Sequence, residues 1–82
     1  MSVITTKKII GCEPEAILIM PLYDNRNVAD WRIDTHITYE DMSVADYFTY
    51  VNKVSTYDVH AMVDNIIDDV MKNQKIPSSW SM

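Results

Sequence analysis

The clearest pattern in the chain is an apolar stripe at the α-helical period. Its members recur at intervals of three and four residues: Val59, Met62, Val63, Ile66, Ile67, Val70 and Met71. Such spacing places all of them on one side of a helix. The other side is polar and mostly acidic, with Asp58, His60, Asp64, Asn65, Asp68 and Asp69. The sequence therefore predicts an amphipathic helix that ends at about Asn73, with one packed side and one acidic side.

Three earlier segments have the composition or the period of β-strands. Val3 to Ile10 is rich in β-branched residues, and Gly11 marks its end. Ala16 to Tyr23 begins with an unbroken apolar run, which favours a strand covered on both faces or at the centre of a sheet. Pro21 predicts that this strand ends there or meets an edge. From Trp31 to Glu40, packing and polar residues alternate strictly, which predicts one packed face and one wet face.

A further helix is predicted from about Val44 to Lys53. Ser43 and Ser55 are each followed three residues later by an aspartate, the aspartate variant of a capping box at a helix start. A helix here would turn four residues toward the core: Val44, Tyr47, Phe48 and Val51. The expected order is therefore β-β-β-α-α. This is an α+β fold, with a three-stranded antiparallel sheet followed by two packed helices on its apolar face.

Composition limits the chain to one small domain and a narrow range of partners. Residues 1–82 hold a single core, and residues 76–82 are expected to form a flexible tail. The net charge of −5 disfavours direct binding to nucleic acid and to anionic membranes. Cys12 has no second cysteine to pair with, which fits synthesis in a reducing cytoplasm. No apolar run approaches the length of a membrane span, and the first ten residues do not resemble a signal peptide.

Candidate catalytic and metal-binding groups are few. His60 and Asp64 lie four residues apart on the predicted helix, a spacing that an ordinary solvated helical pair explains. Asp34, His36 and Glu40 share the wet face of one strand, but a zinc site needs more ligands and a second shell. With one glycine, the chain has no glycine-rich phosphate loop. We therefore predict a protein without catalytic activity, cofactor or metal.

The acidic side of the amphipathic helix offers one functional hypothesis. Asp58, Asp64, Asp68 and Asp69 could mimic a DNA phosphate track and occupy a basic groove of a host enzyme such as a defence nuclease. An ordinary solvated helix face explains the same row, and Lys72 dilutes its charge. Aromatic residues offer a second hypothesis, because Tyr50 and Trp80 lie off the apolar stripes, as interface anchors do. For Trp80, a disordered tail is the alternative.

Residues 7–24 resemble a known family. The matching segments are Lys7-Lys8-Ile9-Ile10-Gly11-Cys12-Glu13, the apolar run Ile17 to Met20, and Pro21-Leu22-Tyr23-Asp24. Together they resemble the N-terminal half of the small outer capsid protein of T-even-type tailed phages. The shared elements are a Lys-Lys-Ile-x-Gly-x-Glu turn, an apolar strand, and a Pro-Leu-Tyr strand exit before an acidic turn. The C-terminal half is similar in pattern only, and its Asp-rich helix departs from the family.

The resemblance implies a non-enzymatic structural protein of the bacteriophage virion. Such a protein decorates the outside of the assembled capsid and clamps neighbouring subunits of the major capsid protein lattice, without a cofactor. It would be made in the host cytoplasm and reside on the virion surface. The candidate partner-binding residues are Tyr23, Asp24, Arg26, Tyr50 and Trp80. The alternatives are a small acidic phage-type inhibitor of a host enzyme and an adaptor subunit of a cellular complex. The oligomeric state stays open, with a trimer on the shell as one option.

Overall fold

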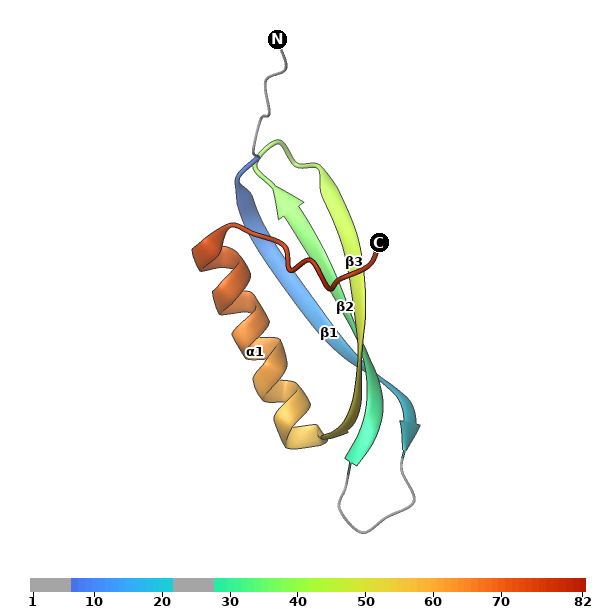
Figure 1. The fold of residues 1–82 in the computed structure, drawn as a ribbon. Helices are drawn as coiled ribbons and strands as arrows, with labels where there is room; N and C mark the ends of the chain where they lie inside the picture. Colours follow the sequence, from blue (N-terminus) through green and yellow to red (C-terminus); the bar gives the residue numbers. More distant parts are fainter. Residues whose placement is uncertain (1–6, 22–27) are drawn as a thin grey trace.

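The chain folds as a three-stranded antiparallel sheet with one long helix (Figure 1). The computed structural model describes residues 7–21 and 28–82. The elements are β1 (Ile9–Pro21), β2 (Val28–Tyr39), β3 (Val44–Ser55) and α1 (Thr56–Asn73). The strands lie in the order β1-β2-β3, so β2 is central and the other two form the edges. The predicted α+β class and three-stranded antiparallel sheet are confirmed, whereas the described residues contain one helix and not two.

β2 is the strand whose strict alternation the sequence displays. Every second residue along it is buried: Ala29, Trp31, Ile33, Thr35 and Ile37. The intervening polar residues lie on the opposite face and are partly exposed. Trp31 also donates its indole N–H to the Val54 carbonyl of β3, at 2.9 Å, so its polar atom is satisfied inside the core. The period-two pattern was sufficient here because one face of the central strand is packed and the other is not.

β1 joins two segments that the sequence pattern separates. Gly11 does not end the strand. It lies opposite Thr38, next to an irregularity in the pairing between Ile9 and Gly11. A Cβ atom on Gly11 would lie 3.3 Å from the Thr38 Cβ, so the missing side chain permits this close approach. The prediction that the Ala16–Tyr23 segment is covered on both faces is wrong for the described residues. β1 is an edge strand, and Ile17 to Met20 are exposed.

The helix predicted from Val44 to Lys53 is wrong, because this segment is strand β3. It pairs antiparallel with β2 along its length. The competing signal was its wealth of β-branched and aromatic residues, which fit a pleated surface better than a helix. Ser43 does not cap a helix, and its N–H instead donates to the Asp41 carboxylate. Val44, which the helix would have buried, is 55% exposed.

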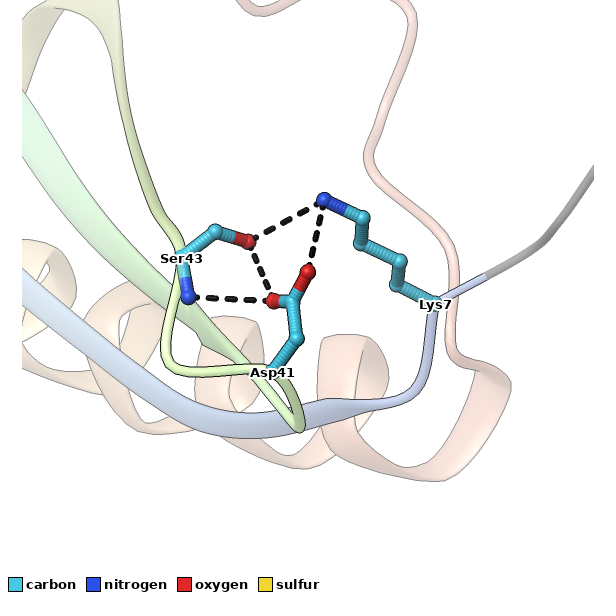
Figure 2. Close-up of polar contacts among 3 residues, drawn as sticks. All are labelled: Lys7, Asp41 and Ser43. Atoms are coloured by element: carbon cyan, nitrogen blue, oxygen red, sulfur yellow. Dashed lines mark hydrogen bonds and ion pairs between the residues drawn. The ribbon is translucent and has the colours of Figure 1, made fainter.

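A small polar cluster holds the turn between β2 and β3 (Figure 2). The Ser43 hydroxyl and N–H donate to one Asp41 carboxylate oxygen, at 2.5 and 3.0 Å. The Lys7 ammonium lies 2.9 Å from the other oxygen and 3.3 Å from the Ser43 hydroxyl. The hydrogen bond from the Ser43 hydroxyl, followed by that from Lys7, holds the pKa of the Asp41 carboxyl well below its ordinary value. The cluster therefore ties the start of β1 to the hairpin.

α1 begins where the sequence predicts, but fewer residues of its apolar stripe are buried than expected. The Ser55 hydroxyl accepts a hydrogen bond from the Asp58 N–H at 3.0 Å, which confirms the cap. Val59 and Val70 are buried, whereas the rest of the apolar stripe is partly covered and Met62 is 38% exposed. Figure 1 shows why: α1 runs along one side of the sheet, mainly beside β1, and does not lie across all three strands.

The segment after α1 crosses the same face of the sheet and reaches β3 (Figure 1). Ser81 and Phe48 exchange two backbone hydrogen bonds, at 2.8 and 2.9 Å. Trp80 is partly buried and packs against the core cluster of Ile9, Cys12, Ile37 and Val70. Its ring centroid lies 6.0 Å from that of Tyr47. The sequence suggested a flexible tail, but in this arrangement the tail completes the covered face of the sheet.

Candidate interaction surface

The sheet has one covered face and one open face. α1 and the C-terminal segment pack against the covered face. Strand pairing places a second set of side chains together on the open face: Glu13, Glu15, Ile17, Arg32, Asp34, His36, Asp46, Phe48 and Tyr50. They come from all three strands because residues opposite each other in an antiparallel pair point to the same side. The open face is therefore polar and charged, with aromatic residues toward the β3 edge.

A groove of about 510 Å³ runs over this open face, and only some of the charged side chains that line it contact an oppositely charged or imidazole partner. On the β2–β3 side they are paired: the Arg32 Nε lies 2.6 Å from an Asp34 oxygen, and the His36 Nδ1 lies 2.5 Å from an Asp46 oxygen. The hydrogen bond with Asp34 is the main cause that raises the pKa of the Arg32 guanidinium, which also lies 4.6 Å above the Phe48 ring.

The β1 side of the groove carries two further carboxylates, on Glu13 and Glu15. Neither forms an ion pair with another residue in the described parts of the chain. Because Asp34 pairs with the Arg32 guanidinium and Asp46 contacts the His36 imidazole, the open-face carboxylates without such a partner among the described residues are those of Glu13 and Glu15 on β1. This side of the groove is the part that would attract a basic group.

The second half of β1 presents an apolar surface. Ile17, Leu18, Ile19 and Met20 are 40%, 52%, 47% and 57% exposed. Four neighbouring side chains exposed to this degree leave on the order of a few hundred Å² of apolar surface, comparable to the largest patch on a typical monomer, which is often functional. No charged residue interrupts the run. Natural edge strands normally carry such charges to prevent association, so an uncharged apolar stretch at an edge is unusual for an isolated molecule.

The fold protects other parts of its two edges. At the start of β1, the Gln74 side-chain amide accepts a hydrogen bond from the Ile9 N–H at 2.7 Å and donates to the Ile9 carbonyl at 3.1 Å. On β3, the Ser81 backbone pairs with Phe48. Gln74 holds this position from a left-handed backbone conformation, with φ of 54°, at the end of α1. Beyond Ile9, no other described segment pairs with the outer edge of β1.

The residues proposed from the sequence as contacts do not form one site. Tyr23, Asp24 and Arg26 lie outside the described residues. Tyr50 is 56% exposed on the open face, with its ring 5.8 Å from that of Phe48. Trp80 lies on the opposite, covered face, where it packs into the core. The apolar end of β1 was missed as a site because its continuous run suggested burial. The absence of charged residues from this run was the sequence signal that could have identified it as a site.

The acidic row of α1 is exposed as the sequence predicts. Asp58, Asp64, Asp68 and Asp69 all face solvent. Within the described parts of the chain, none of the four forms an ion pair. They lie on the outer side of the helix, whereas the groove lies on the open face of the sheet. The protein thus presents two separate acidic regions.

The groups considered for catalysis or metal binding are engaged elsewhere or solvated. Asp34 and His36 pair with Arg32 and Asp46, and in residues 7–21 and 28–82 no three potential ligands gather closely enough for a metal. Burial raises the pKa of the Cys12 thiol, which lowers the fraction of reactive thiolate. Within the same residues, no helix has both the length and the apolar character needed to cross a membrane.

No protein-family model, curated protein or solved structure matches this chain. The choice among functions therefore depends on the surfaces described above and on the resemblance of residues 7–24.

Proposed function

We propose that this protein is a non-enzymatic structural protein that binds the outside of an assembled phage capsid and clamps neighbouring capsid subunits. The observation that carries the proposal is the exposed apolar end of β1, Ile17 to Met20. This run belongs to the stretch that resembles the small outer capsid proteins, directly before the Pro21-Leu22-Tyr23 motif. An exposed apolar run on an edge strand suits a protein whose function is to bind another protein.

The size and shape of the domain support the same proposal. One face of the sheet is filled by α1 and the C-terminal segment, so the molecule has a packed body. The apolar end of β1 projects away from α1 (Figure 1). A small domain of this kind can contact one subunit through the β1 end and a neighbouring subunit through another surface. Binding to two linked subunits gains avidity that an isolated subunit does not provide.

Co-sedimentation with undecorated capsids of a T-even-type phage tests this proposal. Purified protein is mixed at moderate salt with intact capsids or with isolated major capsid subunits at the same subunit concentration. We expect saturable binding to the capsids and at least tenfold weaker binding to isolated subunits, because only the lattice supplies both contacts. Absence of co-sedimentation with the capsids would contradict the proposal.

The second candidate function is inhibition of a host enzyme through the acidic side of α1. The observation in its favour is that Asp58, Asp64, Asp68 and Asp69 are all exposed on one helix. Binding through such a row would weaken steeply as salt is raised, whereas binding through the apolar end of β1 would change little. Salt-sensitive binding to a nuclease that is lost in Asp64→Asn/Asp68→Asn, without any binding to capsids, would favour the inhibitor.

A further inference from the structure

We propose that the Glu13–Leu18 part of β1 accepts an extended segment of a shell subunit as an additional strand of the sheet. This inference depends on the proposed function, because the partner is a subunit of the shell. It goes further by naming the mode of binding, which is backbone pairing, and the chemistry of the segment that pairs.

The position of Pro14 indicates which backbone groups of β1 face outward. Pro14 lies opposite Thr35 in regular antiparallel pairing with β2. A proline has no N–H to donate, so within a sheet it occupies an edge strand with its nitrogen directed away from the neighbouring strand. The pairing continues without a register shift as far as Leu18. Because backbone direction alternates along a strand, Ala16 and Leu18 then direct their N–H and C=O groups to the outer edge, like Pro14.

This part of the edge differs from the rest of the sheet border. The outward groups of Ile9 are occupied by Gln74, and those of Phe48 by Ser81. No comparable partner among the described residues reaches Ala16 or Leu18. The arrowhead of β1 in Figure 1 lies on the opposite side of the sheet from α1, so the helix does not cover the end of this edge. The described residues therefore supply hydrogen-bond partners to the outer edges at Ile9 and Phe48, and supply none between Pro14 and Pro21.

The surroundings of this edge define the segment that fits it. A strand added outside β1 would place side chains beside Glu13 and Glu15 at one end, and beside Ile17 to Met20 at the other. The two glutamates are open-face carboxylates without an ion-pair partner among the described residues, so the first end favours lysine or arginine. The second end is apolar and uncharged, and favours aliphatic side chains. The occupant is therefore an extended segment that is basic at one end and aliphatic at the other.

A second copy of this chain fits the edge less well. Its own β1 would bring another Glu13 and Glu15 to the same edge, and the whole chain already carries a net charge of −5. Charge therefore favours a different, basic partner over self-association.

Ala16→Pro tests backbone pairing directly, because it removes one outward N–H and leaves the pairing with β2 intact. Pro14, two residues earlier, already occupies an equivalent position in the same strand. We expect Ala16→Pro to keep the circular dichroism spectrum of the wild type and to bind undecorated capsids at least tenfold more weakly. Ala16→Ser, which retains the N–H, is the matched control and should bind within about twofold of the wild type.

Amide hydrogen exchange in the wild-type protein keeps the proposal testable if Ala16→Pro does not fold. In the free protein, the Ala16 and Leu18 amides should exchange at least tenfold faster than those of Glu15 and Ile17, which face β2. On capsids, the Ala16 and Leu18 amides should become protected.

A charge substitution tests the expected preference for a basic segment. Glu15→Lys should weaken capsid binding about threefold or more, whereas Asp68→Lys on the far side of α1 should not.

The outcomes separate this inference from the proposed function. If the wild type fails to bind capsids, the proposed function is wrong and the inference falls with it. If the wild type binds and Ala16→Pro binds equally well, or the two amides stay unprotected on capsids, the strand-addition proposal alone is wrong. Concentration-dependent dimers in sedimentation velocity, abolished by Ala16→Pro, would assign the edge to a second copy and overturn the proposal.

Discussion

Replacing Trp80 by alanine separates two roles for the C-terminal segment. The sequence suggested that Trp80 contacts a partner from a flexible tail. In the structure, Trp80 packs instead against the core cluster that includes Ile37 and Val70, with its ring 6.0 Å from that of Tyr47. A partner anchor would affect binding and leave folding unchanged, whereas a core residue would affect the free energy of unfolding.

The expected loss follows from the degree of burial. Truncating a fully buried tryptophan costs about 3–5 kcal/mol. Trp80 is only partly buried, so its share is smaller, and loss of the contact with the Tyr47 ring adds about 0.5–1.5 kcal/mol. We therefore expect Trp80→Ala to lower the free energy of unfolding by about 2 kcal/mol. For a domain of this size, that lowers the melting temperature by about 8–16 °C.

Urea denaturation followed by far-ultraviolet circular dichroism measures this loss. Tyr57→Ala is the matched control, because Tyr57 is 83% exposed and should change the free energy of unfolding by less than about 0.5 kcal/mol. An unfolding midpoint in Trp80→Ala equal to that of the wild type would refute the docked tail. Weaker capsid binding without any loss of stability would restore the interpretation of Trp80 as a contact residue.

Three further predictions test the fold. Ile37→Ala should lower the free energy of unfolding, measured in urea, by about 3–4 kcal/mol, because Ile37 is fully buried. Val44→Ala, at an exposed position, should lower it by less than about 0.5 kcal/mol. Equal losses would contradict the strand assignment. Ser55→Ala should cost about 1 kcal/mol through the lost helix cap, and an unchanged midpoint would exclude Ser55 as the cap. Asp41→Asn should lower the melting temperature at pH 7. Because the pKa of Asp41 is depressed, its contribution is present above the ordinary value of 3.8 and fades below it, so the melting temperatures of the two proteins should converge in acid. A difference that persists unchanged at acid pH would contradict this account.

The sequence was most informative where one side of an element is packed and the other is not. β2 alternates strictly, and Ser55 caps the amphipathic helix, so both were predicted. The sequence was misleading at β3, where an apolar spacing of three and four residues coincides with strong β-propensity. A serine and an aspartate at the right spacing can also occur in a turn, as Ser43 does.

The candidate site was harder to predict because it depends on which strand lies at an edge. The run Ile17 to Met20 has the composition of a buried central strand, and only the sheet order makes it exposed. Tyr50 and Trp80 both appeared to lie off the apolar stripes. Pairing with β2 leaves Tyr50 exposed, whereas the path of the C-terminal segment carries Trp80 into the core. Such differences arise from tertiary contacts that no local pattern encodes.

The thermal transition of undecorated capsids tests the central proposal most directly. Calorimetry with increasing amounts of the protein should show the melting temperature of the capsid rising until the sites are saturated. Leu18→Lys, which places a charge on the apolar end of β1, should abolish the rise, whereas Val44→Lys, at a position of similar exposure on β3, should preserve it. A capsid transition that does not move with excess wild-type protein, or that rises equally with Leu18→Lys, would contradict binding through this surface.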